Sequence, residues 1–199
     1  MRPITTVSLM GVGGQGILLG AAILAQAAAA QGLDVKASEV KGMAQRGGSV
    51  LSTVRFGSEV WSPVSQHADV VVATELLEGR RGLSLLAAGG VLVCAATTRI
   101  LPGSVLRREE TYPEHDDLEA AAHDRDVRLL AVDAEGLARR AGSERAVNVA
   151  LLGAASTFLP LAEESWQKGL AAAVPAKILE VNQRAFALGR AAAGEEVAQ

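Results

Sequence analysis

Apolar and polar positions follow a pattern typical of strands that alternate with helices along most of this chain. Continuous apolar runs predict buried strands, at Thr5–Met10, Asp69–Ala73, Val91–Ala95 and Val127–Val132. The stretches between them have helical spacing and composition, at Ile17–Gln31, Glu75–Leu86, Asp116–His123 and Ala134–Ala141. Strands that alternate with helices indicate a right-handed α/β arrangement with a mostly parallel sheet.

Two further segments have strand character but do not fit a simple alternation with helices. Asp34–Ser38 is short, and Ser49–Phe56 alternates between two faces. Gly57 and Ser58 then form a two-residue turn before Glu59–Trp61. A two-residue turn with glycine between alternating segments is typical of a β-hairpin. We therefore expect a hairpin inserted into the sheet.

The C-terminal quarter of the chain is helical throughout. Three helices are predicted here, at Val147–Phe158, Ala162–Ala172 and Pro175–Ala192. Pro175 suits the first turn of a helix, where its missing N–H is not needed. We expect a single Rossmann-like domain over residues 1–199, with a sheet core over 1–145 and a helical part over 146–192.

Composition limits the function classes. The chain has 199 residues, a net charge of −3 and 49% hydrophobic residues, which is typical of a globular protein without a nucleic-acid-binding surface. Residues 17–30 are apolar, but the run is too short to span a membrane and contains Gln26. It also follows a glycine loop instead of a basic leader. We expect a cytoplasmic protein that binds neither nucleic acid nor membrane.

Cysteine and histidine usage argues against redox and metal centres on this chain. Cys94 is the one cysteine, so neither a disulfide framework nor an iron–sulfur cluster with about four thiolate ligands is expected. It ends a predicted buried strand, which favours an inert, packed thiol. The three histidines lie far apart without metal-ligand spacing. No nucleophile has an evident base, so we expect no catalytic and no metal-ligating residue.

Two glycine-rich segments are the candidate binding elements. The first, Gly11-Val12-Gly13-Gly14-Gln15-Gly16, links a strand to a helix, where backbone N–H groups can approach an anion. The second runs from Gly42 to Ser49 ahead of a strand. The predicted binding residues are Gly11, Gly13, Gly14, Gln15, Gly16, Gln45, Arg46, Gly47 and Gly48.

Each of these segments also has a simpler interpretation. The first loop could be a tight turn without a ligand, or a dinucleotide site in which Glu39 holds a ribose hydroxyl. Arg46 could be a solvated loop residue, or it could bind a phosphate through two parallel hydrogen bonds. Asn148 stands at the start of an apolar helix, which favours a helix cap over a ligand contact.

The glycine segments and their surroundings resemble a known family. Val12–Ile17, Ser38–Val50 and Val54–Gly57 are similar to the gamma domain of 2-oxoacid:ferredoxin oxidoreductases. The string from Met43 to Gly48 is most similar to the beta subunits of the indolepyruvate branch. The later segments follow in the family's order, at Ala68–Val72, Gly89–Val91, Asn148–Ala154 and Lys177–Phe186. The resemblance covers nearly the whole chain.

This resemblance implies oxidative decarboxylation of an aryl-pyruvate to an aryl-acetyl-coenzyme A, with ferredoxin as the electron acceptor. It places thiamine diphosphate, magnesium and [4Fe–4S] clusters on a larger alpha subunit, since this chain has one cysteine and no Gly-Asp-Gly motif. The small subunit would share the coenzyme A site, with its two glycine segments at the phosphates. The resemblance implies an assembly with two copies of each chain.

Two other functions remain open at this stage. The chain could be a free-standing NAD(P)-binding oxidoreductase, or a partner subunit with a purely structural role. Trp61 and Trp166 are expected to be exposed and to mark, with the alanine-rich C-terminal helices, a surface for a partner.

Overall fold

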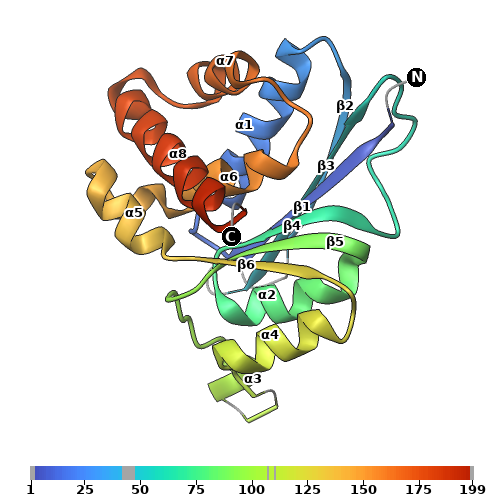
Figure 1. Ribbon diagram of the computed structural model, residues 1–199, viewed down its shortest axis with the longest axis vertical. Coiled ribbons are helices and arrows are strands. Elements are labelled where there is room, and N and C mark those ends of the chain that lie inside the picture. Colours follow the sequence, from blue (N-terminus) through green and yellow to red (C-terminus); the bar gives the residue numbers. More distant parts are fainter. Residues whose placement is uncertain (1–2, 42–47, 107, 110, 198–199) are drawn as a thin grey trace.

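The computed structural model describes residues 3–41, 48–106, 108–109 and 111–197. One six-stranded sheet crosses the molecule in the order β2-β3-β1-β4-β5-β6 (Figure 1). Its strands are β1 (Thr5–Val12), β2 (Asp34–Lys41), β3 (Ser49–Gly57), β4 (Ala68–Ala73), β5 (Leu86–Ala95) and β6 (Arg128–Val132). The pairings β1–β4, β4–β5 and β5–β6 are parallel, whereas β3 runs antiparallel to both β1 and β2. The predicted α/β fold with a mostly parallel sheet is confirmed.

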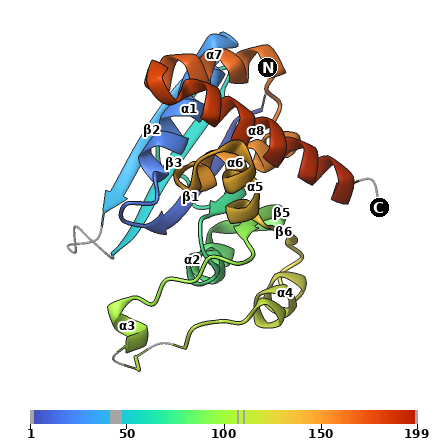
Figure 2. The same ribbon diagram turned by 90° about the vertical axis from the view of Figure 1, so that its left-hand side faces the viewer.

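Helices cover the two faces of this sheet unequally (Figures 1 and 2). The first face carries α1 (Ile17–Ala30), α5 (Ala134–Ala141), α6 (Val147–Ala155), α7 (Glu163–Ala173) and α8 (Ala176–Val197). The second face carries α2 (Leu76–Gly82) and α4 (His115–His123), and the short α3 (Gly103–Leu106) lies beyond them. The 3-10 turns are η1 (Leu83–Leu85), η2 (Glu144–Ala146) and η3 (Ser156–Phe158).

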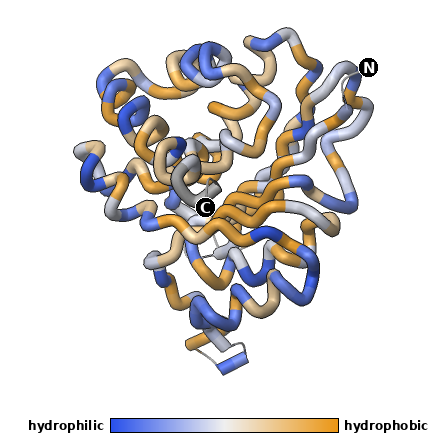
Figure 3. The backbone as a smooth tube through the Cα atoms, in the orientation of Figure 1, coloured by the Kyte–Doolittle hydropathy of each residue, from blue (hydrophilic) through white to orange (hydrophobic). Residues whose placement is uncertain are grey.

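The apolar core is divided between the two faces because successive strand residues point in opposite directions. Val7 and Leu9 pack with Ile23 and Leu151 on the first face. Met10, on the second face, belongs to the cluster that contains Val71, Cys94, Leu77 and Leu118. Hydrophobic residues accordingly concentrate along the central strands (Figure 3). No helix within the described ranges has the length and apolar character needed to cross a bilayer.

The expected hairpin after Gly57 is wrong. Residues 58–67 form no strand, and β3 pairs instead with β2 and β1. Side chains satisfy the backbone of this loop: the Asp34 carboxylate accepts from Val60 N at 2.8 Å, and Arg55 donates to Ser62 O and Val64 O at 2.6 and 2.9 Å. A loop held in this way has no need of a cross-strand ladder.

Two helix ends differ from the prediction by several residues, and one short helix was missed. The helix expected over Glu75–Leu86 ends at Gly82, because Leu86 begins β5 and pairs with Ala68. The last helix continues to Val197 instead of ending at Ala192. The short α3 was not predicted.

The C-terminal helices pack closely against one another and against α1. A methyl group on Gly153 of α6 would overlap the carbonyl of Phe186, and one on Gly189 of α8 would overlap the carbonyl of Ala150. Gly169 brings α7 onto the backbone of α1 near Ile23 in the same manner. The expected exposure of Trp166 is wrong: its side chain is fully buried, with its ring centroid 5.2 Å from that of Phe186. The helical C-terminal part is therefore integral to the first-face core.

A candidate functional site at the carboxyl edge of the sheet

The two glycine segments meet at one edge of the sheet. Gly13 N donates a 3.0 Å hydrogen bond to Gly48 O, and Val12 pairs with Ser49 where β1 ends and β3 begins. This edge carries the carboxyl ends of β1, β4, β5 and β6, where ligands bind in open α/β sheets. Gln45, Arg46 and Gly47 lie outside the described residues, so their predicted role stays a prediction.

The turn from β1 to α1 depends on glycine at two positions. Gly14 and Gly16 have φ values of +103° and +74°, a region that disfavours other residues. Gly16 is the N-cap of α1 and provides no side chain to cap the helix. A side chain at Gly16 would also collide with Asn148, whose Nδ2 donates to Gly16 O at 2.9 Å. The partial positive charge of the α1 N-terminus therefore faces this loop without a side-chain acceptor from Gly16.

Gln15 and Gly11 hold the loop from inside the protein. The Gln15 Oε1 accepts from Val12 N at 2.6 Å and from Thr74 Oγ1 at 2.7 Å, and its Nε2 donates to Thr74 O at 3.3 Å. These bonds join the end of β1 to the end of β4. Gly11 lies within β1, where a methyl group would overlap Thr74 Oγ1. Both residues thus position the loop from within, and of the two only Gln15 lines the neighbouring cavity.

A cavity of about 620 Å³ opens beside the loop. It is lined by Gly14, Gln15, Gly16, Leu19, Thr98, Glu135, Glu144, Arg145, Val147 and Asn148. Arg145 is exposed, and its guanidinium forms no ion pair with any residue in the described part of the chain. Thr98 donates to the Glu135 carboxylate at 2.9 Å. A cation, a helix N-terminus and two carboxylates are suited to a ligand with phosphate and hydroxyl groups.

Several of these lining residues were not predicted. Thr98 follows β5, Glu135 follows β6, and Arg145 lies in the turn before α6. For Thr98 and Glu135, a position shortly after a predicted strand was the available signal, since such loops gather at the carboxyl edge. Arg145 follows a helix and had no such signal. The helix cap expected at Asn148 from the sequence is wrong. Asn148 is the second residue of α6, whose N-cap is Ala146, and its side chain is nearly buried against Gly16.

A buried polar network lies on the second face below this edge. Glu75 caps α2 by accepting from Leu77 N and Glu78 N at 3.1 and 2.6 Å, and it also accepts from the Tyr112 hydroxyl. Burial raises the pKa of Glu75, and burial together with the adjacent Glu75 raises that of Tyr112. Glu78 is equally buried and accepts from Ser49 Oγ at 2.6 Å. This network fixes the start of β3 without opening into the cavity.

Cys94 lies in the same core cluster and is fully buried, as predicted. Burial raises the pKa of its thiol, so a thiolate is disfavoured at neutral pH. The packed, buried position expected for this thiol from the sequence is confirmed.

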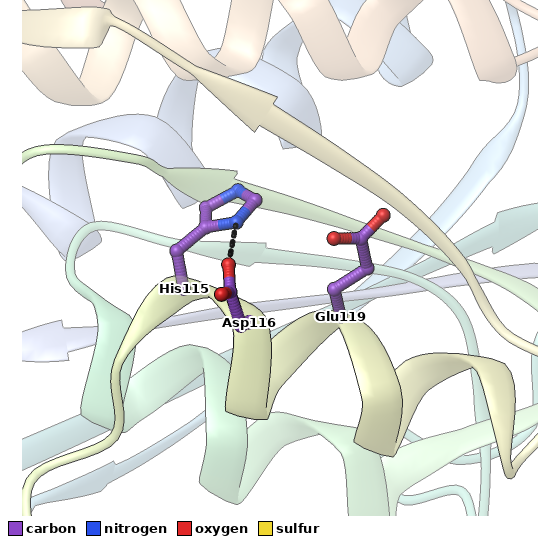
Figure 4. A group of neighbouring side chains, drawn as sticks. All are labelled: His115, Asp116 and Glu119. Carbon is purple, nitrogen blue, oxygen red and sulfur yellow. Dashed lines mark ion pairs between the residues drawn. The ribbon is translucent and has the colours of Figure 1, made fainter.

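One cluster on α4 has the residue types of a cation site. The ligand atoms of His115, Asp116 and Glu119 lie within 4.8 Å of one another, and His115 Nδ1 is 3.9 Å from Asp116 Oδ1 (Figure 4). The spacing of histidines along the sequence could not reveal this cluster, because two of its three groups are carboxylates. All three are exposed and come from one helix turn, with no ligand from another described element, so we assign no metal to them.

The sequence profile of the pyruvate ferredoxin/flavodoxin oxidoreductases matches residues 6–192. The chain belongs to this family. Among its relatives, the indolepyruvate oxidoreductase subunit IorB of Thermococcus kodakarensis is 40% identical over 95% of this chain and 96% of its own. The gamma subunit of a keto/oxoacid ferredoxin oxidoreductase from Geobacter sulfurreducens shares the fold, with a TM-score of 0.72 and 24% identity over 96% of this chain and 99% of its own.

Other members of the family carry the same domain within longer chains. The ketoisovalerate oxidoreductase subunit VorA of Methanothermobacter thermautotrophicus is 30% identical over 98% of this chain, which covers 38% of VorA. A 2-oxoglutarate:ferredoxin oxidoreductase from Magnetococcus marinus, solved with coenzyme A bound, has a TM-score of 0.74 at 22% identity, with 98% of this chain and 32% of that one covered. A similar domain thus makes up nearly the whole subunit in IorB and one part of a larger polypeptide in VorA.

Proposed function

We propose that this chain is the small subunit of an indolepyruvate ferredoxin oxidoreductase. The IorB relative, similar over almost its full length, supports this assignment. In this proposal a larger subunit holds the thiamine diphosphate, the magnesium ion and the [4Fe–4S] clusters, in an assembly with two copies of each chain and ferredoxin as acceptor. The donor set of this chain fits that division, because Cys94 is buried and a cluster needs about four thiolates.

We further propose that the cavity at the carboxyl edge is this chain's share of the coenzyme A site. The observation that carries this proposal is the Gly13–Gly48 hydrogen bond, which brings the second glycine segment beside the first, and Gly14, Gln15 and Gly16 of the first segment line that cavity. The N-terminus of α1 and the Arg145 guanidinium would hold phosphate oxygens, whereas Glu135 and Glu144 suit ribose hydroxyls. When bound, coenzyme A supplies the thiol that takes up the acyl group. The family's solved relative with coenzyme A gives the proposal independent support.

The residues present fit the phosphate groups of such a ligand on one side of the cavity only. Glu135 and Glu144 would repel phosphates, so the phosphate end belongs beside Gly14, Gly16 and Arg145. Gln15 would act by positioning the loop through Thr74. Arg46 remains a second candidate for a phosphate contact, from the segment outside the described residues.

The arrangement of strands weighs against the NAD(P) alternative. A dinucleotide site of the usual kind has its acidic residue at the end of the strand next to β1. Here β3 lies between β1 and β2. Glu39 is on the edge strand β2, where it pairs with Ser52 of β3. Glu39 therefore stands two strand spacings from β1, about 10 Å away.

Kinetics of the assembled complex test the coenzyme A proposal. We expect Arg145→Ala to raise the apparent KM for coenzyme A by about ten- to a hundredfold, as for a lost charge-assisted hydrogen bond. Arg46→Ala should have a similar effect, and Arg46→Lys should recover part of it, since a point charge cannot replace two parallel bonds. The control is Arg139→Ala, an exposed arginine of α5 that does not line the cavity. An unchanged KM with intact assembly would remove the arginine concerned from the site.

The same preparations test the division between subunits. The isolated chain should be colourless and inactive with indolepyruvate. Activity should appear when the larger subunit is added, with thiamine and cluster content unchanged by the arginine substitutions. Oxidation of indolepyruvate by the isolated chain would overturn the assignment.

A further inference from the structure

We propose that the second face of β2 and β3, which no helix in the described part of the chain covers, is the docking surface for the larger subunit of the oxidoreductase, together with the Trp61 loop (residues 58–67). This inference rests on the proposed function and specifies where the two chains meet. The helices of the second face do not reach this surface. The main contacts of α2 are with β1, β4 and β5, and those of α4 are with β6 and α2. Figures 1 and 2 show β2 and β3 at one side of the molecule, away from these helices.

The strand register defines the composition of this face. Cross-strand neighbours share a face of a sheet, so Leu51 and Val40 continue the row that begins at Met10. The β1 members of the three rows, Met10, Ser8 and Thr6, are buried, so the accessible part of this face lies on β3 and β2. Ser8, Thr53 and Ser38 form the next row, in which the Ser8 and Thr53 hydroxyls are 3.1 Å apart. The third row contains Thr6, Arg55 and Lys36. Apolar side chains thus lie toward the carboxyl edge, and hydroxyl groups occupy the middle.

The charges on this face are already engaged within the chain. Arg55 donates to Thr6 Oγ1 and to two loop carbonyls, and Lys36 pairs with Asp34 at 2.8 Å. A surface of this kind favours a partner with apolar and hydroxyl-rich side chains, and disfavours nucleic acid or an anionic membrane.

The loop at the other end of this face presents two large apolar side chains. Trp61 is 84% exposed and Val64 is 70% exposed, and Val40, in the first row, is 61% exposed. The loop is nevertheless well anchored, because Val60 is buried and Arg55 and Asp34 bind its backbone. An exposed tryptophan on a preorganised backbone is typical of an interface hot spot, since little ordering entropy is lost on binding. Such a residue is otherwise unfavourable on a monomer surface.

The longer relatives indicate the occupant. This domain is 38% of the VorA chain and 32% of the Magnetococcus marinus chain, so in those proteins it is covalently joined to a larger remainder. In IorB-type relatives the same domain makes up almost the whole subunit. A contact that is internal in the fused proteins then has to form between chains. The proposed face also ends beside Ser49 and Gly48, next to the carboxyl-edge cavity, so a partner seated on it reaches that edge.

The test is reconstitution of the complex from this chain and the larger subunit of the same oxidoreductase. Sedimentation or surface plasmon resonance would give the Kd for wild type and variants. We expect Trp61→Ala to weaken binding by about 30-fold, the loss typical of a hot-spot aromatic, and Val40→Arg to weaken it at least as much. The matched controls are Ile178→Ala and Ile178→Arg. Ile178 is 44% exposed on α8, which covers the opposite face, and its substitution should leave the Kd unchanged.

A spectroscopic readout separates contact from misfolding. The chain has two tryptophans, Trp61 exposed and Trp166 buried, so labelling with 5-fluorotryptophan gives two ¹⁹F resonances, assigned with Trp61→Phe. Unlabelled larger subunit should shift the Trp61 resonance and leave that of Trp166 in place. Unchanged Trp61 resonance and unchanged Kd values in a complex that still forms would overturn this inference and leave the proposed function standing.

Two further outcomes of the reconstitution and the ¹⁹F measurement have a different meaning. If wild-type chain and larger subunit do not associate at all, the proposed function itself fails. If the Trp61 resonance shifts with the concentration of this chain alone, a second copy occupies the face and the inference is overturned.

Discussion

The Ser49 hydroxyl donates a 2.6 Å hydrogen bond to the Glu78 carboxylate, which fastens the first residue of β3 to α2. Glu78 is 1% exposed and also pairs with Arg81 one turn later in the helix. The second glycine segment leads directly into Ser49, so the bond sets the point from which that segment leaves the sheet. Ser49 thereby connects the candidate ligand-binding edge with the polar network on the second face.

We expect Ser49→Ala to destabilise the protein by about 1–3 kcal/mol, the usual cost of leaving a buried carboxylate oxygen without a donor. Urea unfolding monitored by circular dichroism measures this free energy. Ser84→Ala is the control, because its exposed hydroxyl donates to Arg81 O and its loss should cost less than about 0.5 kcal/mol. Equal effects of the two substitutions would contradict the role given to Ser49.

Two glycines of α8 should respond oppositely to the same substitution. Gly189→Ala should destabilise by at least about 1–3 kcal/mol, because the added methyl overlaps the Ala150 carbonyl and forces α6 and α8 apart. Gly194→Ala should be neutral or stabilising by up to about 1 kcal/mol, since a methyl group there meets no atom within 4 Å. Thermal unfolding of both variants provides the comparison. A stabilising Gly189→Ala would refute the close packing of these helices.

Truncation of Trp166 should show how much its indole contributes to the stability of the fold. Its Nε1 is buried without a hydrogen-bond partner in the described structure, and an unpaired donor of this kind is unfavourable. Trp166→Phe removes that donor and keeps the contact with Phe186, so we expect a loss below about 1.5 kcal/mol. Trp166→Ala leaves a cavity and should cost about 3–5 kcal/mol. Chemical denaturation measures the unfolding free energy of both variants. Equal losses of free energy in the two would contradict this prediction.

Stability should fall as the pH rises above the ordinary pKa of Glu75. Burial holds the folded-state pKa of Glu75 above its ordinary value of 4.5, so the folded protein keeps the proton after the unfolded chain has lost it. The unfolding free energy therefore declines with rising pH through this range, and Glu75→Gln should flatten that decline. Urea titrations from about pH 4.5 to 7.5 measure it. Glu164→Gln is the control, since Lys168 lowers the pKa of that exposed carboxyl. If Glu75→Gln left the dependence of the unfolding free energy on pH unaltered, Glu75 would not hold its proton in the folded protein.

Local patterns predicted most of the sheet and the place of the first glycine loop. Val7, Leu9 and the run Val70–Val72 lie in strands of a buried sheet, where apolar continuity is a reliable signal. The hairpin after Gly57 failed because Asp34, which is far earlier in the chain but pairs with Gly57 across the sheet, and Arg55 satisfy the backbone of the loop. No local pattern encodes such a side-chain contact.

The candidate site was predictable only in part for the same reason. Gly14 and Gly16 are required by the loop itself, whereas Thr98, Glu135 and Arg145 reach the cavity through the order of the strands. The burial of Trp166 could have been predicted. Trp166, Gly169 and Leu170 have the i, i+3, i+4 spacing of one buried helix face, which outweighs the polar residues around them.

The way in which the C-terminal helices complete the first-face core has a consequence for biosynthesis. Leu151, Trp166 and Phe186 belong to the same cluster as Val7 and Leu9, which leave the ribosome more than a hundred residues earlier. Chains emerge N-terminus first, so this face of the sheet stays apolar and open until α6 and α8 have been translated. A nascent chain interrupted before α6 would therefore be a substrate for chaperones and proteases.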